Sequence, residues 1–156
     1  PGLPGVSGQI TTHRFPDSPR SWLDILKRGP MGVLNYIHSR LVGAAVAFHA
    51  QQMGARCERK GTLRYCYGGN PSFLKKQGGT TYGDTFWTDY KYRGAEKRRL
   101  IKHESAHVRQ WDRSGLFFGV KYLASYAYSN LRYGNQCHNR YERAAGFRNG
   151  RYFACR

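Results

Sequence analysis

The segment HESAH at positions 103–107 contains residue types that can hold a metal ion and move a proton. On a helix, residues four apart lie one turn from each other on the same face, so the imidazoles of His103 and His107 can reach one ion. Zinc is the usual ion of such a pair, and in catalytic sites a water molecule completes its coordination. Glu104 is placed to accept a proton from that water and to deliver it to a leaving amine. The pattern predicts a Zn²⁺ site with two histidine ligands and Glu104 as general base.

A third protein ligand must come from another part of the chain, which has only four glutamates. Glu142, in NRYERAAG, lies on a predicted helix that follows a reversal of the chain, so its carboxylate can return to the metal. His138 competes for this role. Glu142 also has a purely structural explanation, because Asn139 as N-cap with a glutamate three residues later forms a capping box. We favour Glu142 as the third ligand.

Several helices must position these residues. The strongest helical pattern is AEKRRLIKHESAHVRQWDR, residues 95–113, and Gly115 is placed to end it. Shorter helices are expected at about residues 21–27, at 117–131 and from Asn139 onward. A longer helix is expected over residues 31–54, with an apolar stripe at helical spacing that is predicted to face the core. The stripe consists of Leu34, Ile37, Leu41, Ala45 and Phe48.

Two segments favour β-structure. Residues 56–66, RCERKGTLRYC, predict a hairpin that turns near Lys60 and Gly61. Residues 80–88, TTYGDTFWT, are rich in Thr, Tyr, Phe and Trp and are predicted to form one strand. Together, the predicted helices and strands indicate a mostly helical α+β domain with a small sheet. We expect residues 1–19, which are rich in Pro and Gly, to form a linker-like lead-in, and residues 20–156 to form a single domain.

The four cysteines, at positions 57, 66, 137 and 155, contain no CxxC pair, which disfavours a zinc ribbon or a thioredoxin-like motif. Two disulfides are the natural alternative, and local pairing of Cys57 with Cys66 and of Cys137 with Cys155 is favoured over the two other connectivities. Four reduced, buried cysteines are the competing interpretation. Disulfides predict an oxidising, extracytoplasmic location.

The charge balance predicts affinity for polyanions. The chain of 156 residues has 26 Lys and Arg against nine Asp and Glu, a net charge of +17. Nucleic acid, acidic lipid surfaces and anionic cell-wall polymer are all candidate partners, and charge alone does not choose among them. The most apolar stretch, Leu41 to Phe48, is far too short to span a membrane, so no transmembrane segment is expected.

The segment LIKHESAHVRQW, a following Gly, an aromatic-rich helix and NRYERAAG together resemble small bacterial proteins with the pattern HExxHxxQW…G…Y…NxxExxAG, which are similar to gluzincin-type metallopeptidases. The upstream GGTTYGDTFW resembles the glycine-containing strand before the zinc helix of those proteins. The resemblance covers residues 78–152, about half of the chain. It implies a zincin-like domain with HExxH on a central helix, His103, His107 and Glu142 as zinc ligands and Glu104 as base. Ser105 departs from the aliphatic residue that usually follows HE.

The first functional hypothesis is therefore a zinc metallohydrolase, an endopeptidase that acts on a protein or peptide substrate. Such a protein would be secreted, or delivered into a target cell as a toxin or effector domain, with a cognate inhibitor or immunity protein as a further partner. The second hypothesis is a basic module that binds nucleic acid or an anionic polymer and has a structural metal, with a metal-dependent nuclease between the two.

Other side chains are expected around the site. We expect Gln110 and Trp111 to orient the metal ligands or to line the site, although packing in the core explains Trp111 equally well. The oxyanion stabiliser is left open among several arginines and five tyrosines: Tyr82, Tyr122, Tyr126, Tyr133 and Tyr141.

Overall fold

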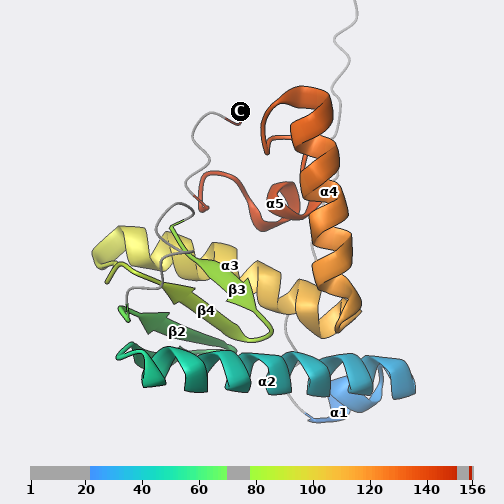
Figure 1. Cartoon of the computed structure of the whole chain (residues 1–156). Helices are drawn as coiled ribbons and strands as arrows, with labels where there is room; N and C mark the ends of the chain where they lie inside the picture. The colour runs from blue at the N-terminus through green and yellow to red at the C-terminus, as the bar shows by residue number, and fades with distance from the viewer. Residues whose placement is uncertain (1–21, 70–77, 151–154, 156) are drawn as a thin grey trace, which may run out of the picture.

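The computed structural model describes residues 22–69, 78–150 and 155. Its elements are α1 (Trp22–Leu26), α2 (Gly29–Gln52), β1 (Arg56–Lys60), β2 (Leu63–Tyr67), β3 (Thr80–Tyr82), β4 (Thr85–Thr88), α3 (Gly94–Ser114), α4 (Phe117–Tyr133) and α5 (Arg140–Ala145) (Figure 1). The predicted mostly helical α+β architecture is confirmed. None of the helices in these ranges has the length and apolar character needed to cross a bilayer. The predicted lead-in, residues 1–19, lies outside the described residues.

Four strands form one mixed sheet in the order β1-β2-β4-β3. The predicted hairpin is β1 with β2, which pair antiparallel and place Cys57 opposite Cys66. The segment predicted as one strand is instead two, because the chain reverses at Gly83 and Asp84 and pairs β3 antiparallel with β4. Gly83 has a φ of 58°, a conformation that a glycine adopts without strain. Thus β3, the strand nearest the candidate site, lies at one edge of the sheet.

The sheet lies between α2 and α3, with an apolar cluster on each face (Figure 1). Successive residues of a strand point to opposite faces, so Tyr65 packs toward α3 while Cys66 packs toward α2. On the α3 side, Leu100 and Val108 join the strand residues. This packing fixes the sheet side of α3 and leaves its other side, which carries the two histidines, for α4 and α5.

The small residues of α2, and not its large apolar ones, face the interior. Its buried positions are Ser39, Gly43, Ala47 and Ala50. A Cβ atom on Gly43 would overlap a carboxylate oxygen of Asp84 and lie 2.7 Å from the Asp84 backbone nitrogen. The backbone of α2 therefore contacts the β3–β4 turn directly, which a larger side chain would prevent.

The prediction that the apolar stripe of α2 faces the core is therefore wrong. Leu34, Leu41 and Phe48 are 57%, 63% and 64% exposed, and Ile37 and Ala45 are exposed as well. Helical spacing identified a continuous face, but apart from Arg40 the helix has no Lys, Arg, Asp or Glu that would distinguish an outer face from an inner one. The close approach to the β3–β4 turn decides which of them is buried.

A buried ion network joins α2 to the β3–β4 turn and to α3. The Arg40 guanidinium donates to both carboxylate oxygens of Asp112, at 2.5 and 2.6 Å, and lies 3.0 Å from Asp84. Both aspartates are only 1% exposed. Burial raises the pKa of Asp112, and the charge of Arg40 opposes that rise. A buried carboxylate needs such a partner, so the network fixes the C-terminal half of α3 against α2.

Both predicted disulfides are confirmed. Cys57 is bonded to Cys66 across the β1–β2 hairpin, and Cys137 is bonded to Cys155 near the C-terminus. Among the described residues there is no free cysteine. These bonds suggest an oxidising, extracytoplasmic environment.

We predict that Gly43→Ala destabilises the protein by about 1–3 kcal/mol, because the new methyl group must displace the Asp84 carboxylate and the turn that carries it. Gly119→Ala is the matched control, since a Cβ atom at Gly119 in α4 meets nothing within 4 Å. That change should be neutral or slightly stabilising. Urea unfolding of the oxidised proteins measures both, and equal stability of the two variants would contradict the close packing of α2.

Candidate metal centre

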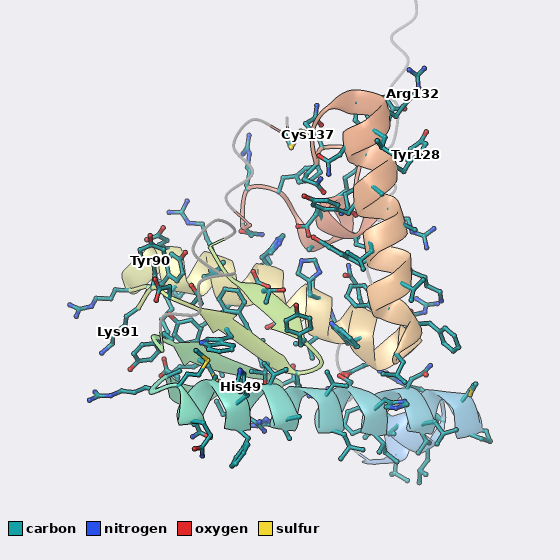
Figure 2. All side chains as sticks on the ribbon, viewed as in Figure 1. His49, Tyr90, Lys91, Tyr128, Arg132 and Cys137 are labelled. Atoms are coloured by element: carbon teal, nitrogen blue, oxygen red, sulfur yellow. A yellow bond between two sulfur atoms is a disulfide. The ribbon has the colours of Figure 1, made fainter. Side chains whose placement is uncertain are left out.

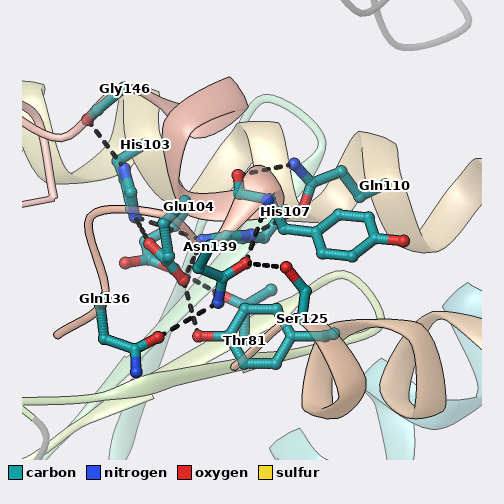
Figure 3. Close-up of polar contacts among 12 residues, drawn as sticks. Thr81, His103, Glu104, His107, Gln110, Ser125, Gln136, Asn139 and Gly146 are labelled. Atoms are coloured by element: carbon teal, nitrogen blue, oxygen red, sulfur yellow. Dashed lines mark hydrogen bonds and ion pairs between the residues drawn. The ribbon is translucent and has the colours of Figure 1, made fainter. Parts of the chain in front are cut away.

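Three side chains that are far apart in the sequence converge at one buried point. His103 and His107 project from one face of α3 (Figure 3). Glu142 comes from α5, which packs against α3. The two Nε2 atoms are 3.2 Å apart. The Glu142 Oε2 atom lies 3.1 Å from His103 Nε2, and its Oε1 atom lies 3.5 Å from His107 Nε2. All three residues are at least nine-tenths buried.

These three side chains can hold one metal ion. Two ligand atoms bound to one tetrahedral Zn²⁺ at about 2.0–2.1 Å are separated by about 3.3 Å, close to each of the three spacings here. Glu142 Oε2 is also buried and makes no hydrogen bond among the described residues, although it is paired with His103 Nε2 at 3.1 Å. An unsatisfied buried carboxylate oxygen is costly, and a cation at this point would satisfy it.

Hydrogen bonds turn both histidines toward this point. His103 Nδ1 donates to the carbonyl oxygen of Gly146 at 3.1 Å, and His107 Nδ1 donates to Gln110 Oε1 at 2.8 Å. The Gln110 amide is oriented in turn, because its Nε2 donates to the Tyr141 carbonyl at 3.1 Å. With both Nδ1 atoms occupied, the Nε2 atoms are the ones that face each other and Glu142. The expected orienting role of Gln110 is thus observed.

Glu142 is held by α4 as well as by the histidines. Tyr122 donates its hydroxyl to Glu142 Oε1 at 2.7 Å. The Tyr122 ring packs against Phe118 and Tyr141, so the hydroxyl is carried on a packed aromatic cluster. Of the five tyrosines considered as oxyanion stabilisers, the structure therefore places Tyr122 against Glu142, the candidate third ligand. Tyr82, Tyr126 and Tyr133 are each at least 40% exposed.

The charges at the centre are strongly coupled. Burial lowers the pKa of His107, but the adjacent Glu142 carboxylate and the charge of Glu104 outweigh this effect and raise it to about 9. Burial acts in the opposite direction on Glu142, whose pKa the two histidines hold well below its usual range. Without a metal ion, a proton on His107 therefore neutralises part of the negative charge at the centre at neutral pH.

Glu104 lies beside the ligands and contacts β3. Its Oε2 atom accepts a hydrogen bond from Thr81 Oγ1 at 2.6 Å. Glu104 is buried, with 7% of its surface exposed. The Thr81 carbonyl accepts in turn from Trp111 Nε1 at 3.1 Å. Thr81 thereby joins the edge strand to α3 at both Glu104 and Trp111, and these contacts orient the Glu104 carboxylate.

The chain that follows α5 packs on the first histidine. A Cβ atom on Gly150 would lie 2.6 Å from His103 Nε2, so only a glycine leaves room for the ring. Gly146, in the same segment, supplies the carbonyl that orients His103. The Cys137–Cys155 disulfide encloses this segment together with Glu142. One covalent loop therefore contains the third ligand and the contacts that position the first.

The alternative interpretations of residues 138–142 are not supported. His138 is exposed, and its ring stacks on Tyr133 with centroids 3.6 Å apart. Asn139 does cap α5, since its side chain accepts from the Tyr141 backbone N–H at 3.1 Å. The Asn139 backbone N–H, however, donates to the Gln136 carbonyl, so Glu142 does not close a capping box.

The sequence analysis missed Thr81, the Gly146 carbonyl and Gly150. Thr81 was assigned to the strand before the zinc helix, but no pattern indicated that its hydroxyl reaches Glu104. Gly146 was part of the ERAAG segment without a role. The role of Gly150 cannot be recognised in a single sequence, because the requirement for glycine comes from a steric contact with a histidine 47 positions earlier in the chain.

We predict that metal binding at pH 7 releases at least about one proton per ion, because His107 must lose the proton that its pKa of about 9 retains. The apparent metal affinity should rise with pH until about pH 9. Calorimetric titration in buffers of different ionisation enthalpy measures the released protons. An enthalpy that does not depend on the buffer would contradict the protonated, metal-free centre.

We also predict that Gly150→Ala weakens metal binding by about tenfold or more, because the methyl group displaces the His103 ring. Competition with a chromophoric chelator measures the affinity. Gly119→Ala, whose added Cβ has no neighbour within 4 Å, should bind metal as the unmodified protein does. Equal affinity of all three proteins would show that residues 146–150 do not position the ligand.

No protein-family model, no curated protein and no solved structure matches this chain. Function must therefore be argued from the residues themselves. What the geometry establishes is a buried His103–His107–Glu142 group that could hold a metal ion, with an oriented glutamate beside it.

Proposed function

We propose that the protein is a zinc-dependent metallohydrolase, and in particular an endopeptidase of the HExxH type. The observation that carries the proposal is the convergence of two imidazole nitrogens and one carboxylate at spacings of 3.1 to 3.5 Å, next to a carboxylate that is not part of the group. Two nitrogens and one oxygen are a common ligand set for catalytic zinc, which keeps a fourth position open. The sequence resemblance to gluzincin-type proteins supports the same proposal.

A bound zinc ion would supply Lewis-acid chemistry, polarising a carbonyl group and acidifying a water molecule. Glu104 would then accept a proton from that water and pass it to the leaving amine. Thr81 holds one carboxylate oxygen of Glu104 at 2.6 Å and so limits the directions from which the carboxylate can accept a proton. Gln110 and Gly146 keep the histidines in the tautomer that binds a metal through Nε2.

The setting of this chemistry is part of the proposal. Two disulfides suit a protein that acts outside the cytoplasm, and one of them encloses the third ligand. We infer a secreted or delivered protein that acts on proteins or peptides, a role that includes a toxin or effector with a cognate inhibitor.

A second candidate function is a basic binding module in which the metal is structural. The chain has nine acidic residues, and among those that the structure describes Asp84, Glu104, Asp112 and Glu142 are buried. The surface is therefore strongly cationic and suits a polyanion. This alternative does not explain why Glu104 is oriented beside the ligands, because a structural zinc needs no general base.

We predict that Glu104→Gln keeps the fold and the metal but reduces peptide hydrolysis at least about a hundredfold, because the amide cannot accept the proton. Cleavage of a mixed peptide library by zinc-loaded protein, followed by mass spectrometry, measures activity. Metal content is determined on the same samples.

Two matched changes complete this experiment. Glu96→Gln, an exposed position in the first turn of the same helix, should leave activity and metal content unchanged. Glu142→Gln should lose the metal, because it removes a ligand. Undiminished cleavage by zinc-loaded Glu104→Gln would overturn the catalytic assignment. Stoichiometric zinc with no cleavage by the unmodified protein would favour the binding module.

A further inference from the structure

The outward side of α2 is an apolar surface that no described residue covers. It is made of Met31, Leu34, Ile37, Leu41 and Phe48, which are 44% to 64% exposed. We call these five residues the α2 apolar face. Figure 2 shows side chains projecting from α2 on the side away from the sheet. Leu34, Leu41 and Phe48 recur every seven residues, so they form a nearly straight row along the helix. Exposed apolar surface of this extent marks an interaction site.

The α2 apolar face is free of charge along its whole length but has cations at both ends. Within Gly29–Gln52 the only Lys, Arg, Asp or Glu is Arg40, and it turns inward to Asp84 and Asp112. Lys27 and Arg28 precede the helix, and Arg56 follows it. Long cationic side chains at the ends of an apolar helix can reach toward phosphate groups while the apolar residues enter a bilayer surface.

The short helix α1 extends the same type of surface. It contacts α2 and buries Ile25, but Leu23 and Leu26 remain 67% and 62% exposed. The surface thus consists of two helices that expose aliphatic side chains, with Lys27 and Arg28 between them.

A groove beside the face is lined by charged side chains of the β1–β2 hairpin. It has a volume of about 320 Å³ and lies between α2 and the β1–β2 hairpin. Ala44 and Phe48 line it from α2, and Glu58, Arg59 and Arg64 line it from the hairpin. Arg59 also lies 3.3 Å from Asp84, and its side chain remains 53% exposed. Because Phe48 belongs to both the groove and the α2 apolar face, apolar surface and guanidinium groups are continuous here. This combination matches an anionic headgroup joined to acyl chains.

Charge decides among the possible occupants. A second copy would bring another chain of net charge +17 against this one, and repulsion opposes that contact. We propose that the α1–α2 surface docks on an anionic lipid membrane, with the α2 apolar face at the boundary between headgroups and acyl chains and the flanking cations on lipid phosphates. This docking is independent of the proposed hydrolysis. It would hold the protein at a membrane surface without crossing it.

Co-sedimentation of the whole oxidised protein with lipid vesicles tests the proposal. Vesicles of phosphatidylglycerol mixed with phosphatidylcholine should bind the protein, and vesicles of phosphatidylcholine alone should bind it far less. The triple variant Leu34→Ser, Leu41→Ser, Phe48→Ser should bind the anionic vesicles at least about tenfold more weakly, because it removes three large apolar groups from the contact. High salt should abolish the binding that this variant retains, because only electrostatic attraction is left.

A matched variant is available on α4, which also exposes apolar residues but has Lys121 among them. Val120→Ser, Leu123→Ser, Leu131→Ser removes a similar apolar area from positions that are 63% to 89% exposed. It should bind vesicles as the unmodified protein does. Circular dichroism and metal content of both variants report whether each is folded.

Three outcomes would overturn the proposal. The first is equal vesicle binding by the α2 variant and the unmodified protein, which would reduce the interaction to net charge. The second is an equal loss in the α4 variant. The third is a dimer on size-exclusion chromatography that the α2 variant abolishes, because the face would then be an interface between two copies of the chain.

Discussion

The buried contact of Arg40 with Asp84 and Asp112 is the constraint on which the arrangement of this protein depends. It joins α2, the β3–β4 turn and α3, three elements that are separate in the sequence. Two aspartates that are almost wholly buried would be costly without the guanidinium, so the three elements can pack only in the orientation that brings them to it. In that orientation Thr81 of β3 reaches Glu104 of α3. The position of the candidate base thus depends on a contact made eight residues further along the same helix, at Asp112.

The candidate metal centre adds a second constraint. His103, His107 and Glu142 are buried together, and their partners, Gly146, Gln110 and Tyr122, come from the tail, α3 and α4. Such a group is unfavourable as a mere packing motif, because it buries a carboxylate whose Oε2 is paired with His103 Nε2 but makes no hydrogen bond among the described residues. The Cys137–Cys155 loop limits how far Glu142 can move from the histidines. The stability of the C-terminal segment and the integrity of the centre are therefore coupled, and an oxidising environment favours both.

The way in which α2 packs, with its small residues inside, also determines the surface of the molecule. The helix uses glycine, serine and alanine to approach the β3–β4 turn, and its large apolar residues consequently point outward. If α2 were rotated about its axis to bury its large apolar residues, more apolar area would be buried, but Arg40 would be moved away from both aspartates. The specific polar contact outweighs the non-directional hydrophobic gain, and the protein is left with an apolar face available for docking.

Local signals in the sequence determined the helix that carries HESAH, the β1–β2 hairpin with its disulfide, the cap at Asn139 and three metal-ligand candidates. Each depends on residues close in the sequence, or on a residue type with few alternatives, as with four glutamates. Only the tertiary structure decided which face of α2 is buried, that residues 80–88 form a hairpin, and that Thr81, Tyr122 and Gly150 surround the centre. Those features arise from contacts between distant segments, where steric fit and buried charge select among faces that the hydrophobic pattern does not distinguish.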